Sequence, residues 1–253
     1  MSLSLFSLKH KVAVISGCTR GIGRSMALGL AEGGADVCLL QRNVDDHSVR
    51  DQIRALGRRA EIVYLDVTDQ ASVRAVIDRV LEIFPTIDIL VNNAGIQRRY
   101  PAVEFPEEEW DTVLQANLKA VWTISQAAGK HMVAKGSGKI ITTASLMTFQ
   151  GGILVPAYAA AKGAIGSLTK ALANEWAQHG VNVNAIAPGY IKTDLTDALV
   201  NDPVRSRDIM TRIPAKRWGN PDDFKGPVIY LASSASNYVN GEIMAVDGGW
   251  LGR

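Results

Sequence analysis

The chain has 253 residues, of which 47% are hydrophobic and 21% charged, and its formal net charge at pH 7 is +2. This length and apolar fraction suit a single globular domain with a sizeable core. The balanced charge, without any long basic block, argues against a partner such as nucleic acid or a membrane surface.

The N-terminal segment and the cysteines help to predict the cellular compartment in which the protein works. Residues 1–9 lack a basic stretch followed by a long apolar run, so we expect no secretory signal. No segment approaches the ~20 uninterrupted apolar residues of a membrane-spanning helix. Two cysteines, Cys18 and Cys38, are too few for a disulfide framework, and the scattered histidines have no metal-ligand spacing. The sequence predicts a cytoplasmic protein without a metal site.

Short apolar runs alternate with longer amphipathic segments along the whole chain. In residues 73–84, for example, apolar side chains recur every three or four positions, which predicts a helix. The apolar runs are mostly continuous and β-branched, which is typical of strands buried on both faces. They predict strands at residues 12–15, 37–40, 62–65, 87–91, 139–142, 181–186 and 243–246.

This alternation predicts the fold class. Repeated strand and helix units form a parallel sheet with helices on both of its faces. No linker or internal repeat divides the chain. We therefore expect an α/β fold with one Rossmann-like, doubly wound domain over residues 1–253 and about seven parallel strands.

A glycine-rich turn follows the first predicted strand. It contains Gly17, Gly21 and Gly23 and leads into a helical run from Arg24 to Glu32. Glycine permits a tight turn and the close approach of a pyrophosphate, while a helix N-terminus offers free N–H groups and a positive dipole end. The position between strand and helix predicts a dinucleotide site, with a flexible turn as the alternative.

The end of the second predicted strand bears on which dinucleotide binds. This strand ends in Leu40-Gln41-Arg42-Asn43 and lacks the acidic residue that would bind the ribose 2′-hydroxyl of NAD. Arg42, together with Arg20 in the glycine turn, could bind the 2′-phosphate of NADP, or both arginines could be solvated. The residues favour NADP(H), and NAD(H) stays open.

Four polar residues form a candidate catalytic set. Tyr158 and Lys162 lie four positions apart in a strongly helical run and therefore share a helix face. An ammonium group beside the phenol favours the phenolate, which lowers the tyrosine pKa and suits proton exchange with an alcohol or ketone. Ser145 is expected to end a strand at the ligand-binding edge of the sheet, and Asn117 is a polar residue in an apolar helical stretch.

The segment after Pro188 departs from the alternation. Residues from about 190 to 217 mix charged residues with Asp, Thr and Pro before the pattern resumes at Pro221. Insertions of this kind over a sheet edge often act as lids, so we expect a substrate lid here.

Together these motifs resemble the short-chain dehydrogenase/reductase family over essentially the full length of the chain. The residues that carry the resemblance are Gly17-x3-Gly21-x-Gly23, Asp66-Val67, Asn92-Asn-Ala-Gly95, Asn117, Ser145, Tyr158-x3-Lys162 and Pro188-Gly-x3-Thr193. Ser16 stands where the family usually has threonine and keeps the hydroxyl group.

The resemblance implies roles for these residues. Tyr158 would be the acid/base, and Ser145 would hold the substrate oxygen. Lys162 would lower the tyrosine pKa and bind the nicotinamide ribose, with Asn117 anchoring a water relay behind it.

The resemblance also implies the cofactor contacts. Asp66 and Val67 would flank the adenine, whereas Ile191 and Thr193 would hold the carboxamide. With the residues argued above, the cofactor set is Gly17, Arg20, Gly21, Ile22, Gly23, Arg42, Asp66, Val67, Asn93, Gly95, Tyr158, Lys162, Ile191 and Thr193.

Further segments resemble a branch of the family that acts on sugar acids, the 2-deoxy-D-gluconate 3-dehydrogenases, with gluconate 5-dehydrogenases as near relatives. They include residues 96–99, 145–152, 187–190, 212–219 and 246–251. In that setting Arg98 and Arg99 would suit a substrate carboxylate, with solvent or a subunit contact as the alternative. The resemblance implies NAD for most such enzymes and a homotetramer, in which the apolar end with Trp250 and Leu251 would lie at an interface.

Two other functions remain open at this point. A 3-oxoacyl-thioester reductase on the same scaffold would have an apolar, elongated cleft, whereas a compact polar cleft with arginine would oppose it. A dinucleotide-binding sensor without turnover would have a broken Ser/Tyr/Lys set, which here is intact. The expected partner is therefore a small-molecule substrate, with hydride transfer to or from a hydroxyl or keto group of a sugar acid or polyol.

Overall fold

The structure, a computed structural model, describes residues 3–252. Its centre is one sheet of seven parallel strands in the order β3-β2-β1-β4-β5-β6-β7. The predicted parallel α/β fold is therefore confirmed. The strands are β1 (Val12–Ser16), β2 (Asp36–Gln41), β3 (Ala60–Tyr64), β4 (Ile89–Asn92), β5 (Gly138–Thr143), β6 (Val181–Pro188) and β7 (Ile243–Val246).

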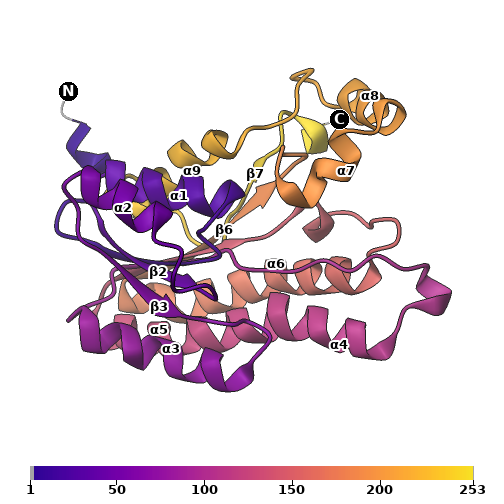
Figure 1. Cartoon of the computed structure of the whole chain (residues 1–253). Helices are drawn as coiled ribbons and strands as arrows, with labels where there is room; N and C mark the ends of the chain where they lie inside the picture. Colours follow the sequence, from indigo (N-terminus) through magenta and orange to yellow (C-terminus); the bar gives the residue numbers. More distant parts are fainter. Residues whose placement is uncertain (1–2, 253) are drawn as a thin grey trace.

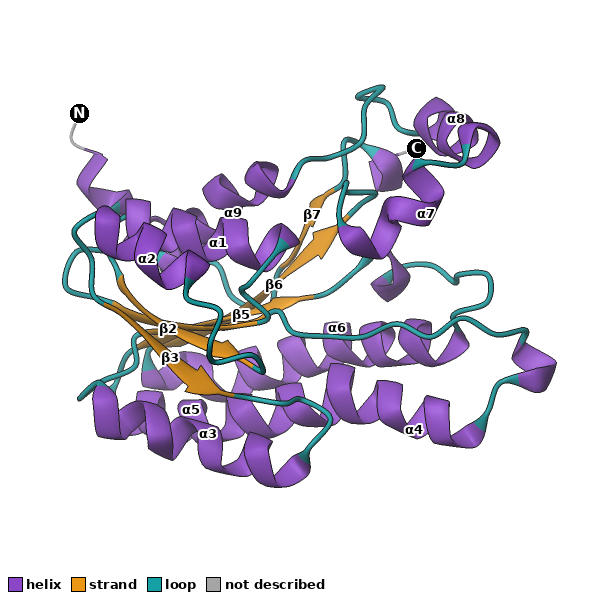
Figure 2. Cartoon of the chain, viewed as in Figure 1, coloured by secondary structure: helices purple, strands orange, loops and turns teal. Residues whose placement is uncertain are grey.

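Helices cover both faces of the sheet (Figure 1, Figure 2). One face carries α1 (Gly21–Glu32), α2 (Ser48–Ala55) and α9 (Lys225–Ala232), and the other carries α3 (Gln70–Ile83), α4 (Glu107–Leu114), α5 (Ala120–Lys135) and α6 (Pro156–Trp176). Two shorter helices, α7 (Asp197–Val200) and α8 (Pro203–Arg212), lie near the arrowheads of β6 and β7.

The sheet divides the hydrophobic core into two layers. Along β1, Ala13 and Ile15 pack into the layer of α1 and α9, whereas Val12 and Val14 pack into the layer of α3, α5 and α6. Because both faces are covered, the strand needs apolar side chains at every position. Burying one such aliphatic side chain contributes roughly 1.5–3 kcal/mol.

The helices begin and end at residues suited to those positions. The Asp69 carboxylate accepts a hydrogen bond from the amide of Ala71 and caps α3. Pro156 opens α6, where its missing N–H needs no partner. Gly136 ends α5 in the left-handed region, with φ of 75°. The ends of α5 and α6 are thus marked in the sequence, and α6 carries the candidates Tyr158 and Lys162.

The C-terminal end differs from one expectation. Strand β7 pairs only with β6, and its side chains are half-buried or exposed rather than buried on both faces. Trp250, expected at a subunit interface, is buried within the chain against Leu146 and Ile213, and the partly buried Leu251 packs against the same cluster. The interface itself stays a prediction.

Three features concern the expectations about cysteines, membrane-spanning helices and metal sites. Cys18 and Cys38 are free and buried. Within residues 3–252, no helix combines the length and apolar character needed to cross a bilayer. In the same part of the chain, no three His, Cys, Asp or Glu side chains are grouped as metal ligands.

Candidate active site

A cavity of about 770 Å³ opens at the carboxyl ends of the central strands. The sheet order reverses between β1 and β4, and parallel α/β sheets bind ligands in the crevice at such a reversal. The walls come from the glycine turn, the ends of β4 and β5, helix α6 and the segment from Pro188 to Arg212.

The glycine turn between β1 and α1 requires its glycines for two different reasons. Gly17 and Gly21 have φ of 65° and 54°, a region that L side chains rarely adopt. Gly23 has an ordinary φ, but a β-carbon there would collide with the carbonyl oxygen of Gly17 and the side-chain amide of Asn93. Gly23 therefore lets the first turn of α1 pack closely on Gly17 and Asn93, and Gly21, Ile22 and Gly23 line the cavity where a pyrophosphate would bind a helix N-terminus.

Hydrogen bonds tie this turn to the end of β4. The Ser16 hydroxyl accepts the amides of Asn93 and Ala94, each at 3.1 Å. The Asn93 side chain donates to the carbonyl of Gly17 at 2.9 Å and accepts from the hydroxyl of Thr143 at 3.1 Å. Asn93 thus links β1, β4 and β5 at the point where they face the cavity. Ser16, which stands in place of the threonine usual in the resembling family, still supplies a hydroxyl group at this position.

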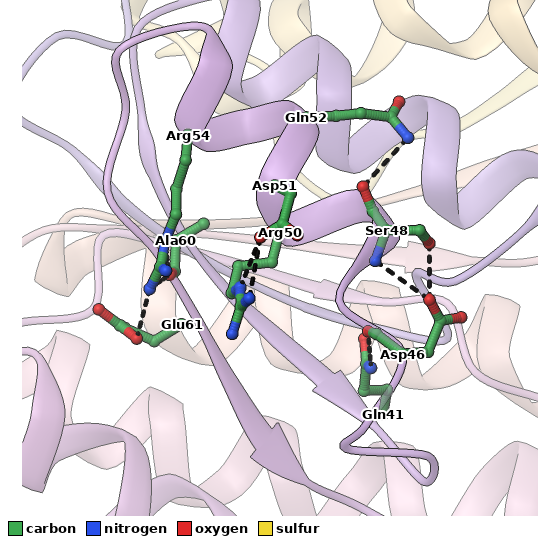
Figure 3. A network of polar contacts seen from close by, with 9 residues as sticks. All are labelled: Gln41, Asp46, Ser48, Arg50, Asp51, Gln52, Arg54, Ala60 and Glu61. Carbon is green, nitrogen blue, oxygen red and sulfur yellow. Dashed lines mark hydrogen bonds and ion pairs between the residues drawn. The ribbon is translucent and has the colours of Figure 1, made fainter.

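The loop after β2 is shaped by a buried glutamine. Gln41 donates to the carbonyl of Asn43. It also donates to the carbonyl of Asp46, whose carboxylate accepts from the hydroxyl and amide of Ser48 (Figure 3). Hydrogen bonds from Ser48 lower the pKa of Asp46 below its ordinary value. The loop that begins at Arg42 is therefore held in a defined conformation.

Arg42 lies at the expected adenosine end of the site but outside the cavity lining. Its guanidinium is exposed and stands 3.9 Å from the carboxylate of Asp66. Asp66 also accepts the hydroxyl and amide of Thr68. Arg42, Asp66 and the neighbouring Val67 thus gather where β2 and β3 end, next to rather than within the described cavity lining.

The predicted cofactor residues otherwise converge on the cavity. Arg20 is exposed at its rim and forms a 2.9 Å ion pair with Asp194, which joins the glycine turn to the segment after β6. Gly17 lies beneath the turn, in contact range of Asn93. The predicted cofactor residues that line the cavity are Arg20, Gly21, Ile22, Gly23, Asn93, Gly95, Tyr158, Lys162, Ile191 and Thr193.

Tyr158 and Ser145 meet in the same cavity. Strand β5 ends at Thr143, so the prediction that Ser145 ends the strand is wrong by two residues; Ser145 instead caps a short 3-10 helix, Leu146–Thr148. Burial raises the pKa of Tyr158 above its ordinary value, and a hydrogen bond with Ser145 acts in the opposite direction.

Lys162 lies beside Tyr158, one turn further along α6. Its ammonium stands 5.6 Å from the centre of the Tyr158 ring and donates to the carbonyl of Thr143 at 2.5 Å. Burial lowers the pKa of Lys162 itself to about 8. Burial of the phenol raises the pKa of Tyr158, in the direction opposite to the one expected from a neighbouring ammonium group.

Asn117 occupies a local irregularity between α4 and α5. Residues Gln115–Lys119 form a π-helical turn, a feature frequent at functional sites. The fully buried Asn117 side chain donates to the carbonyls of Val113 and Ile96 and accepts the amide of Ile96 at 3.3 Å. A β-carbon at Gly95 would collide with it. Asn117 therefore fixes the start of the 96–99 loop and also lines the cavity.

The two arginines predicted to bind substrate differ in their position relative to the cavity. Arg98 forms a 2.7 Å ion pair with Glu109 and lies outside the described cavity lining, so its role as a substrate residue stays a prediction. Arg99 lines the cavity, and its guanidinium donates to the neutral Gln97 side chain at 3.2 Å.

Sequence reasoning missed two further arginines in the cavity wall. Arg205 and Arg212 come from α8, within the predicted lid segment. Their spacing of seven places them on one helix face, which is a signal the sequence contains. Trp250, which supports Arg212, comes from the far end of the chain and had no such signal.

The comparisons with known proteins agree with this geometry. A family model described as Enoyl-(Acyl carrier protein) reductase, one of the short-chain dehydrogenase models, matches residues 17–251. The chain belongs to the short-chain dehydrogenase/reductase family.

Individual members of the short-chain dehydrogenase/reductase family are closely similar. A 2-dehydro-3-deoxy-D-gluconate 5-dehydrogenase from Pseudoalteromonas atlantica is 56% identical, over 99% of this chain and 100% of its own. The protein of the same name from Escherichia coli is 52% identical over 100% of both chains. A solved gluconate 5-dehydrogenase from Burkholderia cenocepacia, in complex with NADP and tartrate, has a TM-score of 0.96 and 41% identity, covering 100% of both chains.

Proposed function

We propose that this short-chain dehydrogenase/reductase catalyses reversible hydride transfer between NADP(H) and a hydroxyl or keto carbon of a sugar acid. The observation that carries the proposal is the convergence of Ser145, Tyr158 and Lys162 on one cavity that starts at the glycine turn. Arg99, Arg205 and Arg212 also line this cavity and form no ion pair within residues 3–252. The names of the Pseudoalteromonas atlantica and Escherichia coli relatives put their reacting carbon at C5 of 2-dehydro-3-deoxy-D-gluconate, and we assign the same position here.

The proposed chemistry assigns each residue one task. When bound, the nicotinamide ring accepts or donates the hydride. In the direction of oxidation, the Tyr158 oxygen takes the proton of the substrate hydroxyl while the Ser145 hydroxyl holds the same oxygen. The Lys162 ammonium binds the ribose and stabilises the phenolate, and Asn117 anchors a water through which the proton leaves.

The cofactor preference is assigned to NADP(H). The two residues directly after β2 are Arg42 and Asn43, so no acidic side chain stands at the position that would repel a 2′-phosphate, and Arg42 is exposed in a loop held by Gln41. The Burkholderia cenocepacia relative binds NADP. We assign NAD(H) as the weaker cofactor, because the glycine turn binds the pyrophosphate and NAD and NADP both contain that group.

The substrate class is supported by charge. Arg99 lines the cavity with free guanidinium donors, and carboxylates bind arginine through two parallel hydrogen bonds. A 3-oxoacyl-thioester reductase is the rival, and the description of the matching family model favours it. A cavity wall with several arginines opposes an apolar acyl chain, and the intact Ser/Tyr/Lys set opposes a sensor without turnover.

The remaining assignments follow from the same proposal. Residues 1–253 act as one catalytic domain, in which the segment at about 190–217 serves as the substrate lid. The active form is a homotetramer in the cytoplasm, which is consistent with two free, buried cysteines and with exposed aromatic side chains at Trp122 and Tyr238.

The test is a scan of absorbance at 340 nm with sugar acids, polyols and acyl thioesters, each with NADP(H) and NAD(H). We expect the highest kcat/KM with a sugar acid and NADP(H), and a preference for acyl thioesters would overturn the substrate class. Tyr158→Phe should lower kcat by about 100- to 10,000-fold, because it removes the proton donor and acceptor, while NADPH still binds. Near wild-type kcat in this variant would contradict the mechanism.

A further inference from the structure

The charges that line the cavity do not balance. Among its described lining residues the acidic side chains are Asp194 and Asp208, and both have partners: Asp194 pairs with Arg20 at 2.9 Å, and Asp208 with Arg207 at 4.0 Å. Besides Arg99, the cations Arg205 and Arg212 line the cavity, and neither makes an ion pair within residues 3–252. The cavity therefore presents positive charge that an anionic ligand would neutralise.

Helix α8 presents these two arginines on one face. Arg205, Ile209 and Arg212 are spaced by four and three residues, so they share a stripe, and each lines the cavity. The partly buried Ile209 packs against the cluster of Leu146, Ile213 and Trp250. Its apolar contact holds the α8 face toward the cavity.

Arg212 has a rigid support. Its guanidinium lies over the Trp250 ring, 4.1 Å from the ring centre, which is the geometry of a cation–π contact. The indole N–H donates to the Gln150 side chain at 3.1 Å, and the Tyr190 ring stands 4.7 Å away. A stacked guanidinium keeps its N–H donors at the edge of the plane, free to form two hydrogen bonds with a carboxylate.

The position of this group favours the substrate over the cofactor. Trp250 packs against Leu146, the residue that follows Ser145, so Arg212 belongs to the wall beside the catalytic hydroxyl. Arg20 and Asp194 belong to the other end, at the glycine turn. A carboxylate that reaches Arg212 would thus lie on the same side as the reacting oxygen.

We propose that Arg212, seated on Trp250 and assisted by Arg205, binds the carboxylate of the substrate. This inference rests on the proposed function and adds the residues of α8 that select an acid over an uncharged polyol. The recognised group is a carboxylate on a short polar chain, and tartrate is a small commercial probe of that chemistry.

The test compares Arg212→Gln with Arg207→Gln. Arg207 lies on the same helix, is exposed and is absent from the described cavity lining, which makes it a matched control. We expect Arg212→Gln to raise KM for the sugar acid and the inhibition constant for tartrate by about 10- to 100-fold, because a charge-assisted pair of hydrogen bonds is lost. KM for NADPH and turnover of an uncharged polyol should stay within about twofold, and Arg207→Gln should resemble the wild type.

Each other outcome has a defined meaning. Equal KM and tartrate inhibition in the two variants would overturn the proposal. A rise in KM for NADPH alone would overturn it by assigning Arg212 to the cofactor. If Arg212→Gln melts below the wild type, Arg212→Lys replaces it, because lysine keeps the charge but loses the paired donors; KM for the acid should still rise at least fivefold. A wild-type enzyme without activity on any sugar acid would instead sink the proposed function, and tartrate binding by calorimetry would still report on Arg212.

Discussion

Tyr158 and Lys162 sit one turn apart on α6, and burial shifts their pKa values in opposite directions. Removal from water disfavours both the phenolate and the ammonium. Within residues 3–252, no acidic group contacts the Lys162 ammonium, which donates a hydrogen bond to the Thr143 carbonyl. Burial of the Lys162 ammonium without an acidic partner among the described residues therefore costs folding free energy.

This cost of burying Lys162 predicts that the stability of the protein depends on pH. The folded-state pKa of Lys162 is about 8, below its ordinary value of 10.5, so the unfolded chain binds more protons between these pH values. The free energy of unfolding contributed by this residue therefore rises with pH from about 8 to 10.5, and the full penalty of burial is present below pH 8. Lys162→Met should remove this dependence.

Urea denaturation of the wild type and Lys162→Met at pH 7, 8, 9 and 10 checks this expectation. The wild type should gain up to about 3 kcal/mol on the variant as the pH rises. Lys170→Met, at an exposed position of the same helix, should keep the wild-type slope. A difference between wild type and Lys162→Met that does not change with pH would contradict the burial argument.

Individual residues differed in how far the sequence could place them. Tyr158 and Lys162 were predictable because helical periodicity puts positions i and i+4 on one face. The sequence could not show which of Arg98 and Arg99 faces the cavity, because side chains in an irregular loop follow no periodic pattern. Arg98 pairs with Glu109 on α4, and this contact depends on the tertiary structure. Trp250 beneath Arg212 required the tertiary structure, because 38 residues separate them in the sequence.

At the scale of elements, α8 is held mainly by its ends and one face. Asp202 caps it by accepting the amides of Val204 and Arg205, and Pro203 occupies its first turn. None of its described residues is buried. A helix with so little core contact depends on its cap, because capping contributes typically about 1 kcal/mol.

Asp202→Ala is therefore expected to act on substrate binding and not on the whole fold. Loss of the cap should destabilise α8 locally by about 1 kcal/mol and raise KM for the sugar acid by up to about fivefold. The melting temperature should stay within about 1 °C of the wild type. Steady-state kinetics and calorimetry on the same preparation provide both readouts.

Asp69→Ala is the matched control, because Asp69 caps α3, which packs in the core. It should lower the melting temperature by about 2–4 °C and leave KM unchanged. If Asp202→Ala instead lowers the melting temperature and spares KM, α8 belongs to the cooperative core.

The elements themselves were largely predictable, and their boundaries less so. All seven predicted strands exist, because apolar β-branched runs flanked by turns suit buried strands. The π-helical turn at Gln115–Lys119 was not predictable, since it depends on Asn117 reaching the backbone of Ile96 across a loop. The expected strand end at Ser145 was wrong because a side-chain cap at that residue starts a 3-10 turn.

At the scale of the whole molecule, cofactor binding should stabilise the fold. The residues around the cavity come from both halves of the chain, so a bound dinucleotide would hold them together. At 100 times its Kd, NADPH should add about 2.7 kcal/mol to the free energy of unfolding and raise the melting temperature by about 5–10 °C.

Differential scanning fluorimetry with NADPH and NADH at equal concentration checks this expectation and the cofactor preference together. NADPH should give the larger shift, and Arg42→Glu should reverse the order, because a carboxylate there would repel the 2′-phosphate and accept the ribose hydroxyl. An Arg42→Glu variant that keeps the larger shift with NADPH would contradict the role of Arg42.

The hydroxyl of Ser16 has a consequence for the newly made chain. Its bonds to the amides of Asn93 and Ala94 span 77 and 78 positions, and the return bond from Asn93 to Gly17 spans 76. During synthesis, the chain must therefore have left the ribosome as far as Ala94 before the glycine turn can complete its hydrogen bonds. Long-range contacts of this kind form slowly, because a large loop must close first. The nascent N-terminal third should not retain dinucleotide until Ala94 has left the exit tunnel.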